Sequence, residues 1–191
     1  MTRAACANSY NAAMDDGLNI ILIGYRGCGK TTIGKLLADQ LWKKFVDVDD
    51  DTCKRFDGKT IAQIWQEFGE PAWRREEVEV TKALVAKKDM IVGLGGGTLM
   101  QPPAREAVEQ AAHARRIYLK CEPEELFRRI SLDKKSAATR PSLTSHGGGL
   151  EEIKEMLAKR EPVYEAVADE IFDVTHVEPE AAVRYLIKNC L

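Results

Sequence analysis

The stretch IILIGYRGCGKTT (residues 20–32) decides the fold of this chain. Four apolar residues run straight into a segment that holds three glycines, an arginine, a lysine and two threonines. An ordinary turn after a buried strand needs only one or two small polar residues. Gly24 to Thr31 instead fits the pattern G-x-x-x-x-G-K-[ST], which follows a strand and opens a helix. The sequence therefore predicts a phosphate-binding loop between a strand and a helix.

The residue types of this loop suit the phosphates of a nucleotide. Gly24, Gly27 and Gly29 permit backbone angles that turn successive N–H groups inward, and the start of the next helix adds partial positive charge. We expect Lys30 to reach the β- and γ-phosphates and the Thr31 hydroxyl to bind Mg²⁺. The alternative is a glycine-rich turn that matches by accident, which the flanking strand and helix argue against.

Length and composition indicate one globular domain that acts on a small molecule. The 191 residues are 45% hydrophobic and 30% charged, which is ordinary for a globular protein. A formal net charge of -2 provides no basic stripe for nucleic-acid phosphates. No apolar run approaches the roughly 18 residues that a membrane-spanning helix needs. We therefore expect small-molecule partners, and neither a nucleic acid nor a membrane as partner. We also expect a monomer, although nothing in the composition implies the oligomeric state.

The cysteines and the first residues point to the cytoplasm. The chain has five cysteines, an odd number with no CxxC pair, at Cys6, Cys28, Cys53, Cys121 and Cys190. This pattern indicates neither a disulfide framework nor a zinc site, and it suits a reducing compartment. Residues 1–18 lack the basic start and apolar core of a signal peptide, so we expect them to form a loose N-terminal extension.

Short apolar runs alternate with longer segments of helical period, as in parallel strands covered by helices. The predicted strands are residues 19–23, 45–48, 90–93, 116–120 and 171–174. The predicted helices are residues 30–41, 72–87, 104–112, 122–132, 150–167 and 179–189. The pattern predicts a doubly wound α/β domain. Residues 133–149 have no periodicity, and a loop of this length is typically a lid.

The acidic run FVDVDDD (residues 45–51) is a second candidate site. Asp47 and Asp49 leave the strand end on the same side, where ligands gather in parallel sheets. Asp47 would serve the metal and the attacking hydroxyl, and Asp49 would accept hydrogen bonds from substrate hydroxyls. The alternative is that the acids start the next helix, which describes Asp50 and Asp51 well and leaves Asp47 and Asp49 undecided.

Two arginines are further candidates. Arg74 has Glu70 four residues before it and Glu77 three after it, so a solvated salt-bridge ladder explains it without any ligand. Arg160 occupies a position in an apolar helical stripe, where a guanidinium needs an anion. That anion is either an internal carboxylate or the carboxylate of a bound substrate. Pro162 is expected to kink or restart this helix.

Together these residues resemble a known family. The chain contains, in order, GYRGCGKTT, FVDVD, FGEPAWRREE, GLGGGT, RPSL and KREPVYEAVAD. These motifs occur in the order and approximate spacing of shikimate kinase, and the resemblance covers nearly the whole chain from Leu18 onward. It implies a nucleoside-monophosphate-kinase-like P-loop fold with a five-stranded parallel sheet. Residues 19–191 would form this single kinase domain, with a mobile lid at about 133–149.

The resemblance also implies an activity. The expected reaction is transfer of the γ-phosphoryl group of ATP to the 3-hydroxyl of shikimate, with Mg²⁺, in the pathway to aromatic amino acids. The implied shikimate-binding residues are Asp49, Arg74, Gly95, Gly96, Gly97 and Arg160, with both arginines on the carboxylate. The implied ATP-binding residues are Gly27, Cys28, Gly29, Lys30, Thr31, Thr32, Arg129 and Arg140.

Within that set the resemblance implies particular roles. Thr31 would bind Mg²⁺ directly, with Asp47 beside it. Arg140, in the lid, would swing onto the phosphates, and Arg129 would stack against the adenine. The catalytic residues would be Lys30, Asp47 and Arg140. Phosphoryl transfer is mostly positioning and charge stabilisation, so Asp47 would orient or deprotonate the attacking hydroxyl.

The chain departs from the family pattern at a few positions. The lid reads Arg140-Pro141-Ser142-Leu143 where Arg-Pro-Leu-Leu is usual, and it is about four residues longer after Arg129. Trp73 stands where Phe is usual. Cys28 is unusual in the loop, and we expect either a reactive thiol at a helix N-terminus or a buried, inert one.

Two other functions compete with this interpretation. A related kinase for gluconate or a nucleoside monophosphate would share the P-loop but has no evident need for both Asp49 and Arg160. A non-catalytic binding module of the same fold would be expected to have lost Lys30, Asp47 or Arg140, and all three are present.

Overall fold

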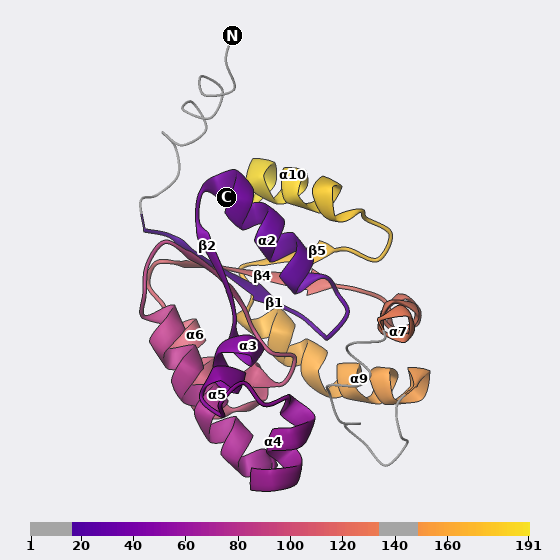
Figure 1. Cartoon of the computed structure of the whole chain (residues 1–191). Coiled ribbons are helices and arrows are strands. Elements are labelled where there is room, and N and C mark those ends of the chain that lie inside the picture. Colours follow the sequence, from indigo (N-terminus) through magenta and orange to yellow (C-terminus); the bar gives the residue numbers. More distant parts are fainter. Residues whose placement is uncertain (1–16, 134–148) are drawn as a thin grey trace.

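The computed structural model describes residues 17–133 and 149–191, and its core is a five-stranded parallel sheet (Figure 1). The strands are β1 (Asn19–Ile23), β2 (Lys44–Asp47), β3 (Met90–Gly93), β4 (Ala114–Lys120) and β5 (Glu170–Asp173). They lie in the order β2-β3-β1-β4-β5, and every neighbouring pair is parallel. The predicted fold class and all five predicted strands are therefore confirmed, with strand ends within about two residues.

Strand β1 is the central strand, and its sequence explains why. All five residues are buried, as expected for a continuous apolar run that is covered on both faces. Ile20 and Leu22 enter one apolar cluster, together with side chains of α2 (Lys30–Leu41) and α10 (Pro179–Asn189). Ile21 and Ile23 enter a second cluster, together with side chains of α5 (Glu70–Val85) and α6 (Pro102–Glu109). The alternation of β1 thus builds a core on each face of the sheet.

Helices cover both faces of this sheet, which completes the predicted doubly wound architecture. Helices α2 and α10 lie on one side in Figure 1, and α5 and α6 lie on the other. The remaining helices are α3 (Val48–Lys54), α4 (Ile61–Phe68), α7 (Pro123–Leu132) and α9 (Leu150–Val167), with a short 3-10 helix at Thr98–Met100. Parallel strands that alternate with helices bring the carboxyl ends of β1, β2 and β3 to one edge.

Two short helices, α3 and α4, were not among the predicted elements. Helix α3 begins directly after β2, and the Asp47 carboxylate caps it by accepting a hydrogen bond from the backbone N–H of Asp49 at 3.0 Å. Helix α4 begins with a reciprocal capping box between Thr60 and Gln63. The alternative interpretation of the acidic run, that it starts a helix, is therefore right about the local structure.

Pro162 was expected to kink or restart helix α9, and the restart is wrong because the helix runs as one element from Leu150 to Val167 with Pro162 inside it. The apolar stripe explains why the helix continues. Ile153, Leu157 and Tyr164 are all buried against the rest of the domain, and this packing outweighs the backbone hydrogen bond that proline cannot donate.

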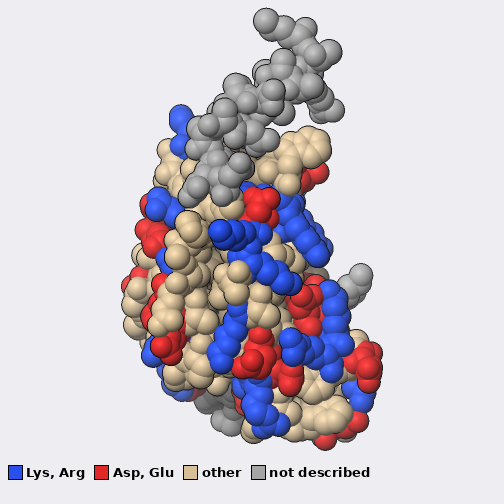
Figure 2. All heavy atoms as spheres, turned by 90° about the vertical axis from the view of Figure 1, so that its left-hand side faces the viewer, with Lys and Arg blue, Asp and Glu red and all other residues tan. Residues whose placement is uncertain are grey.

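The surface of the described residues is mixed in charge. Figure 2 shows one face of the molecule, on which Lys and Arg are interspersed with Asp and Glu. No helix of the described part is long and apolar enough to cross a membrane. Nearly all of the predicted N-terminal extension (residues 1–18) and of the predicted lid, including Arg140, lies outside the described residues.

Candidate active site

The phosphate-binding loop joins the end of β1 to the start of α2 and has the predicted conformation. Gly24, Gly27 and Gly29 have positive φ angles of 149°, 83° and 102°. A side chain at Gly24 would have its Cβ only 2.7 Å from the sulfur of Cys28 and 2.8 Å from the carbonyl oxygen of Leu119. Neither that backbone angle nor that space admits another residue, so the glycine is required for the loop to close.

Lys30 and Thr31 stand at the first turn of α2. The Lys30 ammonium donates hydrogen bonds to the carbonyl oxygens of Gly24 and Tyr25, at 2.8 Å and 3.0 Å, and so lies over the loop. The Thr31 hydroxyl donates to a carboxylate oxygen of Asp47 at 3.0 Å. The structure thus brings together the lysine, hydroxyl and carboxylate that the sequence predicted to act on the phosphates and the metal.

These residues line a cavity of about 390 Å³ at the carboxyl edge of the sheet. The predicted site residues that line this cavity are Gly27, Gly29, Lys30, Thr31, Thr32, Asp47, Asp49, Gly96 and Arg129. We call this cavity the loop pocket. Its size and its helix N-terminus suit the phosphates of a nucleotide.

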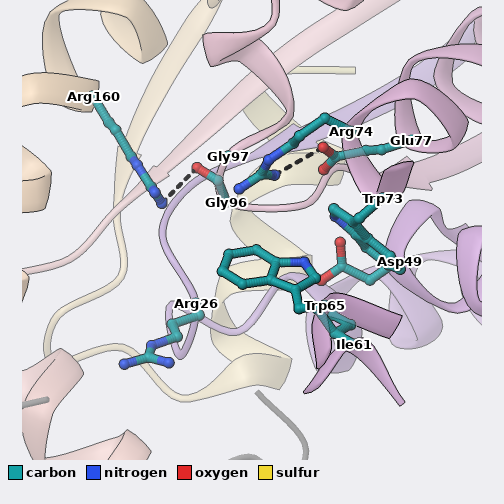
Figure 3. A pocket seen from close by; sticks show the side chains of 10 residues that line it. All are labelled: Arg26, Asp49, Ile61, Trp65, Trp73, Arg74, Glu77, Gly96, Gly97 and Arg160. Carbon is teal, nitrogen blue, oxygen red and sulfur yellow. Dashed lines mark hydrogen bonds and ion pairs between the residues drawn. The ribbon is translucent and has the colours of Figure 1, made fainter. Parts of the chain in front are cut away.

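A second, smaller cavity of about 60 Å³ adjoins the loop pocket, and we call it the arginine pocket (Figure 3). It is lined by Arg26, Asp49, Ile61, Trp65, Trp73, Arg74, Glu77, Gly96, Gly97 and Arg160. Arg26, Asp49 and Gly96 line both cavities, which shows that the two are neighbours. Five of the six predicted substrate-binding residues line it, and the exception is Gly95.

Gly95 lies behind the wall of the arginine pocket. A Cβ at this position would lie 2.4 Å from a carboxylate oxygen of Asp49 and 2.8 Å from one of Glu77. The absence of a side chain therefore lets these two carboxylates approach the loop after β3. Gly95 shapes the pocket without lining it.

Arg74 forms the predicted salt-bridge ladder and also lines the arginine pocket. Its guanidinium donates to Glu70 at 2.9 Å and to the buried carboxylate of Glu77 at 2.9 Å, which is the predicted ladder. It also lines the arginine pocket. Burial by itself lowers the pKa of Arg74, but the ion pair and hydrogen bonds with Glu77 and Glu70 raise it above its usual value. The ladder therefore holds a charged guanidinium in place at the pocket wall.

Arg160 is almost completely buried, with 6% of its surface exposed. It donates to the carbonyl oxygen of Gly96 at 3.0 Å, and its guanidinium lies 5.6 Å from the centre of the Tyr25 ring. Within residues 17–133 and 149–191 no carboxylate forms an ion pair with it. Two anions were considered for Arg160, an internal carboxylate and the carboxylate of a bound substrate. The described residues do not provide the internal carboxylate.

Several buried polar atoms around this pocket have no hydrogen-bond partner in the described part of the chain. They are the Tyr25 hydroxyl and the nitrogen atoms Arg26 Nε, Trp65 Nε1 and Arg160 Nε. Arg26, Trp65 and Arg160 line the arginine pocket, and Tyr25 lies against Arg160. Unpaired buried donors are rare because each one loses its hydration without compensation. Their convergence indicates a ligand rich in oxygen acceptors.

The comparisons with known proteins point to one family. The family model for shikimate kinase matches residues 26–191. The shikimate kinase of Chlorobium chlorochromatii is 42% identical over 153 residues, which is 76% of this chain and 77% of that protein. The shikimate kinase of Nitrosomonas europaea is 36% identical over 192 aligned positions, which is 99% of this chain and 86% of that protein.

The chain belongs to the shikimate kinase family. The family predicted from the motifs is therefore confirmed, and with it the enzyme class, a kinase that uses ATP. Solved shikimate kinases share the fold. The enzyme of Bacteroides thetaiotaomicron has a TM-score of 0.77 at 30% identity, over 90% of this chain and 97% of that one.

Two further structures are similar in fold. A shikimate kinase from Acinetobacter baumannii in complex with shikimate has a TM-score of 0.81 at 24% identity, over 95% of both chains. A gluconokinase from Sinorhizobium meliloti has a TM-score of 0.55 at 17% identity, over 92% of both chains. The fold thus fits shikimate kinases better than this member of a neighbouring kinase class.

Cys28 was expected to carry either a reactive thiol at a helix N-terminus or a buried, inert one. Its side chain is 0% exposed and belongs to the apolar cluster that includes α2 and α10. The loop turns at this point, with the Cys28 N–H donating to the Tyr25 carbonyl at 3.3 Å. Of the two alternatives for Cys28, the structure therefore favours the buried thiol, and its low reactivity stays a prediction.

Arg129 connects three parts of the nucleotide side. Its guanidinium donates to Glu125 at 2.7 Å and to the carbonyl oxygens of Val174 and Thr175 at 2.9 Å and 3.0 Å. A longer contact of 3.5 Å reaches the Cys28 carbonyl. Arg129 therefore ties α7 to the loop after β5 and to the phosphate loop. Its stacking on adenine stays a prediction.

Three residues with polar side-chain groups in the arginine pocket were missed by reasoning from sequence. Arg26 occupies a variable position of the P-loop pattern, and its guanidinium lies 3.6 Å from the buried carboxylate of Glu152. Glu77 had been assigned only to a surface ladder, although it is 1% exposed and accepts a hydrogen bond from Thr98 at 2.7 Å. Trp65 lies on the unpredicted helix α4, and the Thr60–Gln63 capping box was the signal that could have located it.

Proposed function

We propose that this chain is a magnesium-dependent kinase that transfers the γ-phosphoryl group of ATP to the 3-hydroxyl of shikimate, with shikimate 3-phosphate and ADP as products. One observation carries the proposal: an arginine pocket with unpaired donors adjoins a phosphate-loop pocket and shares lining residues with it. Arg26, Asp49 and Gly96 belong to both pockets, so a small acceptor in one is next to nucleotide phosphates in the other.

The arginine pocket matches the chemistry of shikimate, which carries one carboxylate and three hydroxyls. Arg74 and Arg160 present guanidinium groups, which grip a carboxylate with two parallel hydrogen bonds. Asp49 provides a carboxylate that accepts from hydroxyls, and Gly96 and Gly97 bring the backbone close to the ligand. Trp73 and Ile61 add apolar wall for the ring carbons.

The loop pocket is assigned to ATP. Gly27, Gly29 and the start of α2 would surround the phosphates, and Lys30 would turn from the loop carbonyls to the β- and γ-phosphates. Arg129, which also lines this pocket, would face the adenine. Arg140, the predicted lid residue for the phosphates, lies outside the described residues.

The residues next to Lys30 fit Mg²⁺. Magnesium prefers oxygen donors and is usually held by one or two carboxylates or hydroxyls together with substrate phosphates. The Thr31 hydroxyl and the Asp47 carboxylate are such donors, and they already touch at 3.0 Å. Thr31 would hold the ion directly, with Asp47 beside it. When bound, the ion would neutralise charge on the β- and γ-phosphates.

The protein's own share of the reaction is positioning and charge stabilisation. Asp49, Arg74 and Arg160 would fix the acceptor so that its 3-hydroxyl faces the loop pocket. Lys30 would stabilise the negative charge of the transferred group. Asp47 would orient or deprotonate the attacking hydroxyl. We expect the enzyme to act as a monomer in the cytoplasm, and the four free cysteines of the described part are consistent with a reducing compartment.

The test is ADP release with a panel of acceptors, with and without a chelator. Shikimate should support ADP release that the chelator abolishes, whereas gluconate and nucleoside monophosphates should support only the background rate. A higher rate with gluconate or a nucleoside monophosphate than with shikimate would assign the chain to another kinase class. Shikimate-dependent release that survives the chelator would remove Mg²⁺ from the proposal.

A further inference from the structure

We propose that the indole N–H of Trp65 donates a hydrogen bond to an oxygen of the bound acceptor, which makes Trp65 a specificity-determining residue. The inference rests on the proposed function, because it takes the acceptor to be shikimate. No part of the sequence pattern assigned a role to Trp65.

The first observation is the state of the indole nitrogen. Trp65 as a whole is only half-buried, yet its Nε1 atom is shielded from solvent and has no hydrogen-bond partner among the described residues. A buried tryptophan N–H usually finds a partner, because the unpaired donor has lost its water without replacement. A ligand that enters the pocket is the means by which this donor can be satisfied.

The second observation is where the nitrogen lies. Trp65 lines the arginine pocket together with Asp49 and Arg74, and Figure 3 shows its nitrogen on the side of the ring nearer to Asp49. The donor thus stands beside the group proposed to hold a hydroxyl of the acceptor. An oxygen bound there has room to accept from Trp65 as well.

The third observation is that the ring is held in place. The Arg74 guanidinium lies 5.7 Å from the centre of the Trp65 ring, a cation–π contact that favours this orientation. The Trp65 carbonyl accepts the N–H of Gly69 at 3.0 Å, which closes the end of α4. A donor on a fixed ring needs little ordering when the ligand binds, so its hydrogen bond favours the ligand that matches it.

The chemistry of the donor sets the selectivity. An indole N–H donates and never accepts, so it requires a carboxylate, hydroxyl or carbonyl oxygen of the ligand. An acceptor without an oxygen at that place would leave the donor buried and unpaired. Trp65 should therefore favour shikimate over compounds of the same size that have carbon or hydrogen at this position.

The direct test observes the indole N–H itself. The chain has three tryptophans, so ¹⁵N-indole labelling gives few resonances, which Trp65→Phe and Trp42→Phe assign. Saturating shikimate should move the Trp65 proton downfield, and the resonance of Trp42, which is 78% exposed at the end of α2, should not move. A Trp65 resonance that stays in place while shikimate binds would overturn the inference and would indicate an internal partner.

A second test separates the N–H from the ring. Replacing Trp65 by 3-benzothienylalanine keeps the bicyclic shape and substitutes sulfur for the N–H. The Kd for shikimate should rise roughly threefold to tenfold, the effect of one neutral hydrogen bond, and the Kd for ATP should not change. The same replacement at Trp42 is the matched control. An unchanged shikimate Kd would show that Trp65 contributes only packing.

Failure of the inference and failure of the proposed function give different results. Calorimetry on the unmodified protein reports whether shikimate binds at all. If it does not bind, the proposed function fails first. If it binds and neither the Trp65 resonance nor the Kd of the benzothienyl variant changes, only the role of Trp65 is refuted.

Discussion

The Thr31 hydroxyl donates a hydrogen bond to the Asp47 carboxylate over 3.0 Å, and this contact joins the first turn of α2 to the end of β2. Strand β3 lies between β1 and β2 in the sheet, so the contact spans an intervening strand. Strand β3 ends at this edge in Gly93, where a Cβ would lie 3.2 Å from the Phe45 ring and in ordinary contact, at 3.8 Å, with the Asp47 carboxylate. Two oxygen donors thereby meet beside the phosphate loop.

The first prediction tests this pair as part of a magnesium site. Asp47→Asn removes the charge, but it should preserve the cap of α3 because asparagine caps helices as well as aspartate does. The Mg²⁺ concentration for half-maximal turnover should rise at least about tenfold, with the melting temperature nearly unchanged. Asp50→Asn, at an exposed position of the same helix, is the control. If Asp47→Asn needs the same Mg²⁺ concentration as the wild type, the Asp47 carboxylate is not part of the magnesium site.

The second prediction concerns Lys30. Lys30→Ala loses two hydrogen bonds to loop carbonyls, together worth on the order of 1 to 3 kcal/mol, so the protein should stay folded. Turnover should fall by about a hundredfold or more, because the charge on the transferred group loses its main side-chain partner. Steady-state rates and circular dichroism measure the two effects. Lys35→Ala, an exposed lysine on the same helix, should keep the normal rate, and near-normal turnover of Lys30→Ala would refute the loop assignment.

The third prediction separates the two pockets through Arg160. Arg160→Lys keeps the charge and loses the planar fork, so shikimate binding should weaken by about 1.5 to 3 kcal/mol with little change in ATP affinity. Calorimetric titration of each ligand measures this. A much lower melting temperature with both affinities reduced in parallel would instead show that Arg160 is a structural residue.

The fourth prediction follows from the burial of Cys28. Its thiol is 0% exposed, so a thiol reagent should modify it far more slowly than Cys53, which is half-buried on α3. Peptide mapping by mass spectrometry after brief labelling reports the order. Rapid modification of Cys28 in the native protein, with loss of activity that ATP prevents, would restore the idea of a reactive thiol.

The fifth prediction concerns acid stability. Hydrogen bonds from Arg128, and then from Arg129, lower the pKa of Glu125 to about 2, although partial burial raises it. The folded-state pKa is thus below the unfolded value of about 4.5, so this stabilisation is complete above that pH and is lost as the pH falls toward about 2. The difference in free energy of unfolding between the wild type and Glu125→Gln should therefore shrink across this window. A difference that stays constant from about pH 5 to pH 2 would contradict the shift.

Local sequence rules were enough for the parts of the site that lie on one element. The positive φ angles of Gly24, Gly27 and Gly29 follow from the P-loop pattern, and β1 was predictable from its apolar run. The carboxyl-edge rule for parallel sheets pointed to Asp47 as a ligand-facing residue, and the family resemblance implied its place beside Thr31, which it contacts. These features depend on backbone geometry within a short segment, and that geometry is encoded by neighbouring residues.

The features that were missed depend on contacts between distant segments. Arg160 and Gly96 are 64 residues apart, and no local pattern shows that the guanidinium donates to that carbonyl. Glu77 appears solvated from its helical spacing, because its burial depends on Thr98 from another segment. Helix α4 does not belong to this group. Its capping box at Thr60 is a local signal that could have been recognised in the sequence.

The central claim, transfer to the 3-hydroxyl of shikimate, is tested most directly by the identity of the product. The purified protein is incubated with ATP, Mg²⁺ and shikimate, and the product is examined by mass spectrometry and by ³¹P–¹H correlation NMR. The account predicts a monophosphate of shikimate whose phosphorus couples to the proton on C3. Phosphorus on another hydroxyl, or free phosphate without a phosphorylated shikimate, would contradict the account.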